Sequence, residues 1–108
     1  MVTRIKADPL RREAILATLE SNRGELEFLF QKWLRKGDPF DGRLTVRLVI
    51  GPDGSVRDAK TVSEKSSIEH PAFVADVLQN VKRWRFRGDP GETADIPVSF
   101  PLDFKSRD

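Results

Sequence analysis

The chain has 108 residues, the size of one small domain, and its seven Phe and two Trp among 38% hydrophobic residues predict a folded core. It contains no Cys and one His, which excludes disulfides, thiolate chemistry and a Cys/His zinc site. Nineteen Lys and Arg against seventeen Asp and Glu give a formal net charge of +2. So mild a charge favours a general soluble module over a dedicated nucleic-acid binder.

Two helices are predicted before the first strand, over residues 9–20 and 22–36. The residues between them, at 21–24, are capping and helix-breaking types and predict a tight corner or a kink. Asp8 is placed to cap the first helix and Gly37 to end the second. The apolar residues that recur at helical spacing are Leu10, Ala14, Ile15, Leu19, Leu26, Leu29, Phe30, Trp33 and Leu34.

A β-hairpin is predicted next, because apolar and polar residues alternate from 43 to 50. Residues 51–54 read Gly-Pro-Asp-Gly, which predicts a type I turn with a bulge at Gly54. The returning strand, 55–62, breaks strict alternation, so a second bulge is expected near Asp58.

A third helix is predicted over residues 71–83 and a last strand over 96–104. Pro97 and Pro101 would leave two missing N–H groups on the same side of that strand, which places it at a sheet edge. A right-handed crossover then lays the last strand beside the first, giving a three-stranded antiparallel sheet of order 2-1-3 in an α+β fold. The predicted core consists of Leu44, Val46, Leu48, Ile50, Phe73, Val77, Val81, Trp84, Phe86, Val98 and Phe100.

The domain organisation predicted from this pattern is a flexible N-terminus at 1–9, a single domain at 10–104 and a flexible tail at 105–108. The longest apolar stretch, residues 48–50, is far shorter than the roughly 20 residues that span a bilayer. Direct membrane insertion is therefore not expected, and any anchor of the parent protein is expected to lie outside this chain.

Catalytic residues are not organised into a recognisable constellation. His70 has Ser66, Ser67 and Asp76 nearby in sequence, but one His at a helix start gives no framework for a triad, and a structural or surface role is expected for it. The Gly-rich segment 51–54 lies between strands and lacks the Lys-Ser/Thr of a phosphate loop. We therefore predict no enzymatic activity, no cofactor and no metal.

Residues 82–87 read Lys-Arg-Trp-Arg-Phe-Arg, which has two interpretations. Trp84 and Phe86 can pack into the core and leave the cations exposed near a helix C-terminus. Alternatively, the cations and aromatics bind nucleic acid through phosphate contacts and base stacking, and the chain is a small basic nucleic-acid-binding domain. The arginines concerned are Arg83, Arg85 and Arg87.

Four segments follow one another along the chain: the strand 42–50, the turn Gly-Pro-Asp-Gly-Ser-Val at 51–56, the segment Val-Lys-Arg-Trp-Arg-Phe at 81–86 and the closing strand 96–104. In this order they resemble the TonB C-terminal domain superfamily, and within it most of all the AgmX/PglI branch. The resemblance covers about residues 10–104. One departure is that members of this branch commonly carry two cysteines where this chain has apolar residues, near Leu29 and Val74.

The resemblance implies a non-enzymatic interaction module of a bacterial cell-envelope protein, in energy transduction, transport or gliding motility. It implies a periplasmic or envelope location, with the cytoplasm left open, and an envelope protein or a short peptide segment of one as partner, with oligomeric state open. TonB captures its partner by strand addition at the sheet edge, which the two prolines would restrict here. The outer face of the sheet is the alternative surface, and the candidate partner-binding residues are Ile96, Val98, Ser99, Phe100, Arg47, Val49, Arg85 and Arg87.

Overall fold

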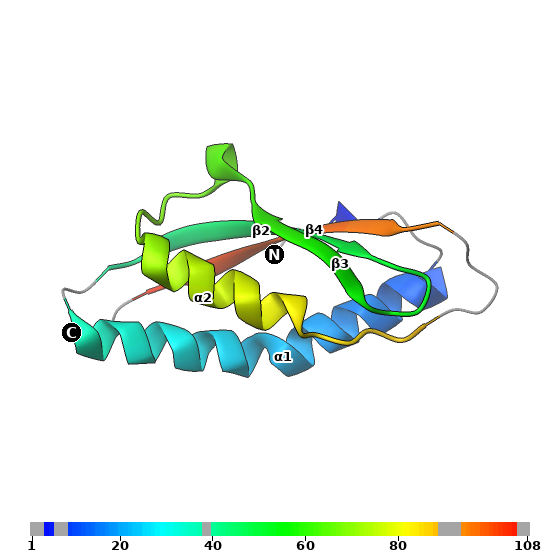
Figure 1. The fold of residues 1–108 in the computed structure, drawn as a ribbon, viewed down its shortest axis with the longest axis horizontal. Helices are drawn as coiled ribbons and strands as arrows, with labels where there is room; N and C mark the ends of the chain where they lie inside the picture. The colour runs from blue at the N-terminus through cyan, green and yellow to red at the C-terminus, as the bar shows by residue number, and fades with distance from the viewer. Residues whose placement is uncertain (1–3, 6–8, 38–39, 89–93, 106–108) are drawn as a thin grey trace.

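A four-stranded antiparallel sheet carries two helices on one face (Figure 1). The computed structural model describes residues 4–5, 9–37, 40–88 and 94–105. The elements in chain order are β1 (Arg4–Ile5), α1 (Pro9–Lys36), β2 (Gly42–Ile50), β3 (Val56–Thr61), the short 3₁₀ helix η1 (Ser63–Lys65), α2 (Pro71–Lys82) and β4 (Ile96–Phe104). The predicted domain boundaries of 10–104 stay a prediction.

The strands lie in the order β1-β4-β2-β3, and each neighbouring pair is antiparallel. The predicted α+β class and the predicted order of the three long strands are therefore confirmed. Between β2 and β3 the register skips Arg57, so the bulge expected near Asp58 is also confirmed. β1 is an additional strand outside β4.

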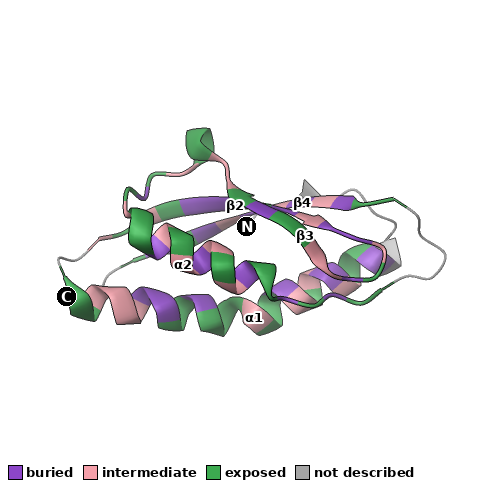
Figure 2. Cartoon of the chain, in the orientation of Figure 1, coloured by how far each residue is buried: buried purple, intermediate pink, exposed green. Residues whose placement is uncertain are grey.

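The core lies between the sheet and the two helices, because β2 and β4 each turn alternate side chains toward the helices. Each of the eleven residues predicted for the core is buried. Figure 2 shows the buried residues concentrated where the helices and the sheet face each other. Apolar and polar residues alternate clearly along these strands because the helices cover one face of the sheet and leave the other face open.

α1 is one continuous helix of 28 residues, so the prediction of two helices separated by a corner at residues 21–24 is wrong, whereas the other alternative, a bend within the helix, agrees with the change of direction midway along α1 in Figure 1. The hydroxyl of Ser21 and the amide of Asn22 both donate to the carbonyl of Thr18, at 3.0 Å each, and these bonds keep the polar side chains within the helix. Gly24 is exposed and costs only its propensity, about 1 kcal/mol. Buried leucines on both sides of the segment hold the helix against the core.

The β2–β3 turn closes as predicted. Gly54 donates to the carbonyl of Gly51 at 3.0 Å, and Gly51 donates to the carbonyl of Ser55 at 2.9 Å. Gly54 has a φ of +88°, and a Cβ there would collide with the carbonyl of Phe86. Position 54 therefore requires glycine for two reasons: the backbone conformation of the turn, and the close approach of the segment that follows α2.

α2 begins with a side-chain cap. Nδ1 of His70 accepts a hydrogen bond from the backbone N–H of Phe73 at 3.1 Å, and Pro71 follows at the first helical position. The His70 ring also lies 4.4 Å from the Phe40 ring, between centroids. The structural role expected for His70 is confirmed.

Candidate partner-binding site

The outer edge of β4 is the first candidate surface. Pro97 pairs with Val49 of β2 and Pro101 pairs with Thr45. Because proline cannot donate to the β2 ladder, the backbone polar groups at these positions face the outer edge. Ser99, midway between the prolines, retains an N–H in this outward row, as does Asp103 beyond them.

β1 occupies this edge at one point. Arg4 is the register partner of Ser99 and Ile5 that of Val98, so the contact falls between the two prolines. The prediction that β4 is the edge strand is therefore wrong at its centre. A two-residue strand has no periodicity to recognise, and its partner is about 95 residues away in the chain. Among the described residues, no strand pairs with the half of β4 that follows Ser99 on this side.

Three of the predicted binding residues cannot offer their side chains to a partner. Ile96, Val98 and Phe100 are buried against the helices. Their backbone N–H and C=O groups alternate with those of the outward row and face β2, so they offer no hydrogen bonds at the outer edge. Their part in partner binding stays a prediction. This placement follows from the alternation of the strand, since the residues that pack in the core are the opposite set from those that face outward.

The outer face of the sheet brings three other predicted residues together. Arg47 is the register partner of Ser99, and Val49 is that of Pro97. The Arg47 side chain is exposed, while Val49 and Ser99 are half-buried. Near η1 this face is covered, because the Thr45 hydroxyl donates to the carbonyl of Lys65 at 2.8 Å. η1 is three residues long, too short to show a periodicity in the sequence.

An exposed ion pair between Arg43 and Asp103 lies at one end of the outer face. Nε of Arg43 lies 2.8 Å from Asp103 Oδ1, and Arg43 Nη2 donates to Asp103 Oδ2 at 3.3 Å. The bidentate hydrogen bond from Arg43 lowers the pKa of Asp103 below its ordinary value of 3.8, and the same bond raises the pKa of Arg43. Arg43 of β2 and Asp103 of β4 are register partners, so the ion pair links the two strands directly.

Acid should remove the contribution of this pair. The pKa of Asp103 is lower in the folded protein than in the unfolded chain, so its contribution is present above the unfolded pKa and is lost as the pH falls through the folded pKa. We expect Asp103→Asn to lower the melting temperature slightly at pH 6 and to leave it unchanged near pH 2. Asp58→Asn, which removes an exposed carboxylate that has no ion pair among the described residues, is the control. Parallel pH profiles for wild type and Asp103→Asn would contradict this prediction.

Arg85 and Arg87 lie at the opposite edge of the sheet from β1. Arg85 forms an isolated antiparallel bridge with Ser55, at the start of β3. Trp84 and Phe86 on either side of Arg85 are buried, so the core-packing interpretation of residues 82–87 is confirmed. Because both aromatic rings are buried, they are not available to stack on nucleic-acid bases. The candidate residues therefore belong to two regions, namely the β4 edge with the adjoining outer face of β2 and β4, and the segment beside β3.

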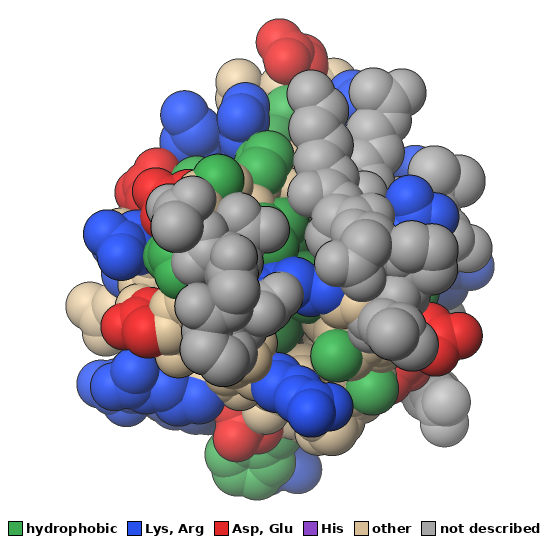
Figure 3. Space-filling model, turned by 90° about the vertical axis from the view of Figure 1, so that its right-hand side faces the viewer, with side chains coloured by type: hydrophobic (Ala, Val, Ile, Leu, Met, Phe, Trp, Pro, Cys, Tyr) green, Lys and Arg blue, Asp and Glu red, His purple; other side chains and the backbone are tan. Residues whose placement is uncertain are grey.

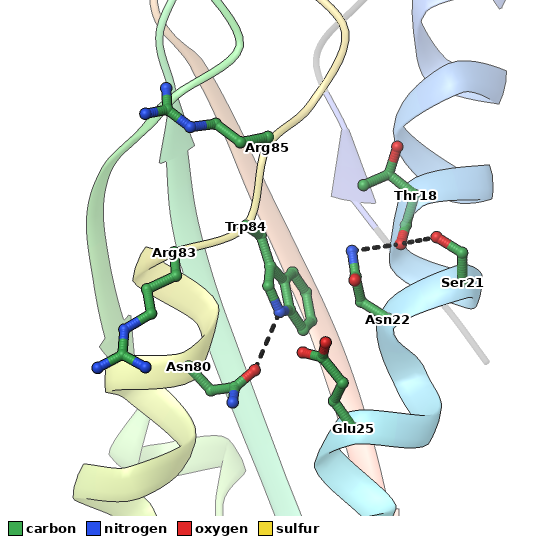
Figure 4. A pocket seen from close by; sticks show the side chains of 8 residues that line it. All are labelled: Thr18, Ser21, Asn22, Glu25, Asn80, Arg83, Trp84 and Arg85. Atoms are coloured by element: carbon green, nitrogen blue, oxygen red, sulfur yellow. Dashed lines mark hydrogen bonds between the residues drawn. The ribbon is translucent and has the colours of Figure 1, made fainter.

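A groove of about 560 Å³ lies between α1 and the segment after α2 (Figure 4). Its polar lining is largely engaged within the protein: the Thr18 carbonyl accepts two side-chain donors, and Trp84 Nε1 donates to Asn80 Oδ1 at 3.2 Å. Glu25 also lines the groove. Nothing in this lining pairs an acid with a base or a nucleophile at hydrogen-bonding distance.

The described part of the chain holds neither a candidate metal site nor a candidate membrane-spanning helix. No group of three or more His, Asp or Glu side chains is arranged to hold a metal ion. No helix there combines the length and the apolar content that crossing a bilayer requires, and α1 is long enough but carries many charges.

An antiparallel sheet with two helices on one face makes this a small α+β domain. Residues 39–106 match the family of Gram-negative bacterial TonB protein C-terminal domains, and the chain belongs to this family. The family consists of non-enzymatic interaction domains of the cell envelope. Comparisons with curated proteins and with solved structures found no match. The matched range begins at residue 39, after α1 ends at Lys36.

Proposed function

We propose that this domain docks an extended segment of an envelope protein onto the outer edge of β4, where the segment replaces β1. The observation that carries the proposal is the pairing of β1 with Ser99 and Val98, which is strand addition within the chain itself. The edge is thus able to form a ladder. A partner segment longer than two residues would extend the ladder along the half of β4 that β1 leaves unpaired.

The energetics favour such an exchange. A net backbone hydrogen bond contributes about 0.5–1.5 kcal/mol, so the two-residue β1 is held only weakly. An added strand could bond to Ser99 and continue to Asp103, which is the next residue of the outward row with an N–H. Pro97 and Pro101 still offer carbonyl acceptors but no donors, and they limit how tightly any strand binds there.

The outer face supplies side-chain contacts next to that edge. Alternate side chains of an added strand would point over the outer face, toward Arg47 and Val49 beyond the Ser99 row. The guanidinium of Arg47 has no ion pair within the described residues and is free to bind an acidic or polar group of the partner. Backbone bonds would give affinity and these contacts would give specificity.

The biological setting that we propose is the periplasm, in machinery for energy transduction, transport or gliding motility. The support is the family membership together with the resemblance of the Val81–Phe86 and Ile96–Phe104 segments to the AgmX/PglI branch. Leu29 and Val74, which replace cysteines of that branch, lie on α1 and α2 and pack in the core. Apolar packing between the helices would then take the place of a covalent link.

Two edge variants with opposite expected effects test the docking mode. Pro97→Val with Pro101→Val restores two outward N–H groups and should increase, by several-fold, the capture of one envelope protein from an extract by the immobilised domain. Ser99→Pro removes the N–H between them and should reduce capture. Removing residues 1–8 should increase capture if β1 competes with the partner.

Thermal melting of each variant controls for folding, since none of these changes touches the β2 ladder. Equal recovery of the envelope protein by wild type, the double variant and Ser99→Pro would move docking away from the β4 edge. If Arg47→Ser reduces recovery of the envelope protein and the edge variants leave it unchanged, the contact lies on the outer face alone.

A further inference from the structure

A second interaction surface lies at the edge of the sheet that is opposite β1. Arg83, Arg85 and Arg87, which we call the arginine row, are exposed. None of the three guanidinium groups has a hydrogen bond, an ion pair or a ring contact within the described part of the chain. Three unpaired cations within five residues concentrate positive charge in a molecule whose net charge is only +2.

The backbone that carries the arginine row is held firmly. Phe86 donates to the carbonyl of Gly54 at 2.8 Å, and Trp84 donates to the carbonyl of Val81 at 3.1 Å. The rings of Trp84 and Phe86 are buried, so they anchor the segment between the arginines. A partner would therefore meet cations whose backbone positions are already fixed, which lowers the entropic cost of binding.

The alternation of the segment directs the row to one side. Figure 4 shows Trp84 turned toward α1, whereas the side chains of Arg83 and Arg85 point away from it. Arg83 ends α2 with helical dihedral angles (φ −91°, ψ −7°), and Arg85 forms a β-bridge, so the spacing of about 7 Å between alternate residues of an extended chain applies from Arg85 to Arg87. An extended peptide with Asp or Glu at alternate positions has the same spacing between its carboxylates. Guanidinium groups bind carboxylates in a bidentate geometry, so such a peptide would place carboxylates at Arg85 and Arg87, and Arg83 would add a third positive charge next to them.

We propose that the arginine row is a docking site for an extended acidic segment of a protein partner, with Asp or Glu at alternate positions. Nucleic acid fits less well, because the aromatics that would stack on bases are buried in the core. A membrane surface also fits less well. Figure 3 shows that the end of the molecule with the β2–β3 turn carries acidic and basic side chains interspersed, so a broad anionic plane would meet carboxylates as well as arginines.

This surface is independent of the docking edge proposed above. Arg85 bridges to Ser55 beside β3, and β2 and β3 lie between that bridge and β4. Two partners, or two segments of one partner, could therefore bind at the same time. Failure of one site leaves the other testable, because variants of Pro97, Ser99 and Pro101 do not touch the arginine row.

The test uses the full chain and a labelled synthetic peptide in which Asp or Glu alternates with Ser, followed by fluorescence anisotropy at low and high salt. We expect Arg83→Gln, Arg85→Gln and Arg87→Gln together to weaken binding at least tenfold. The matched control replaces Arg12, Arg35 and Lys65 by Gln; these side chains are exposed and form no ion pair with described residues, so the net charge changes equally. Binding to the control should change less than twofold, and Ser99→Pro should bind like wild type.

Three results would overturn the proposal. Equal weakening in the arginine-row variant and the control would show that net charge alone attracts the peptide. Tighter binding to a single-stranded oligonucleotide, or to vesicles containing phosphatidylglycerol, than to the peptide would assign the row to another kind of partner. Peptide-induced NMR shifts confined to β4 rather than to residues 83–87 would place the peptide at the other edge.

Discussion

Replacing Phe30 by alanine should lower the free energy of unfolding by about 3–5 kcal/mol, the usual cost of deleting a buried aromatic ring. The Phe30 side chain is 0% exposed, in the second half of α1. The substitution removes the ring carbons from an apolar part of the core, so the lost burial of the ring and the cavity that remains both contribute. In a domain of this size that is a large share of the total stability.

Phe30 is the centre of an aromatic cluster that joins three elements. Its ring centroid lies 5.0 Å from that of Phe104 in β4, 5.9 Å from that of Phe73 in α2 and 5.2 Å from that of Phe40 before β2. The rings meet in tilted or edge-on arrangements, which aromatic pairs prefer. One substitution in α1 therefore loosens contacts to the sheet and to α2 together.

Phe28→Ala is the matched control for this prediction. It makes the same chemical change two residues earlier on the same helix, but the Phe28 side chain is 68% exposed and outside the core. Urea unfolding followed by circular dichroism should show a large drop in the midpoint for Phe30→Ala and a change within about 0.5 kcal/mol for Phe28→Ala. Equal effects of the two substitutions would mean that α1 does not pack as described.

The result also decides what α1 contributes to the domain. The family match begins at residue 39, after α1 ends at Lys36. Yet Ile15, Leu19, Leu26 and Leu29 of this helix are buried in the same core as the sheet. If Phe30→Ala unfolds the domain, the helix is an integral part of this family member, and a fragment reduced to the matched range would expose the core.

The strands could be predicted from sequence because their periodicity is set by burial on one face only. β2 and β4 alternate over nine residues each, and the two prolines of β4 identified the side that does not pair with β2. The predicted helix break failed for the opposite reason. Helix-breaking propensity at Gly24 is a weak local effect, and the packing of both halves of α1 against one core overrides it.

The candidate site was less predictable because it depends on which segments meet. β1 is two residues long, and its pairing with Ser99 is fixed by tertiary structure rather than by a pattern. Likewise, alternation in residues 82–87 left open whether aromatics or cations face the core. The bridge from Arg85 to Ser55 and the burial of Trp84 decide this in favour of the aromatics. The outward direction of the arginine row follows from that packing.

Trp84→Ala should be the other strongly destabilising change, by about 3–5 kcal/mol, because it empties the largest side-chain volume at this end of the core. Trp84 is 5% exposed and its ring stacks on that of Phe100 in β4, with 6.2 Å between centroids. Its indole N–H donates to Asn80 Oδ1 at 3.2 Å, so alanine also removes the partner of an amide in α2.

Trp84→Phe keeps an aromatic ring against Phe100 but loses the hydrogen bond to Asn80 and part of the buried volume of the indole. It should cost clearly less than alanine. Trp33 remains in both variants as a fluorescent probe of urea unfolding. Because Trp84 anchors the backbone between Arg83 and Arg85, the alanine variant should also bind the acidic peptide more weakly under conditions where it is still folded. Wild-type stability in Trp84→Ala would contradict the burial of this ring, and with it the fixed geometry of the arginine row.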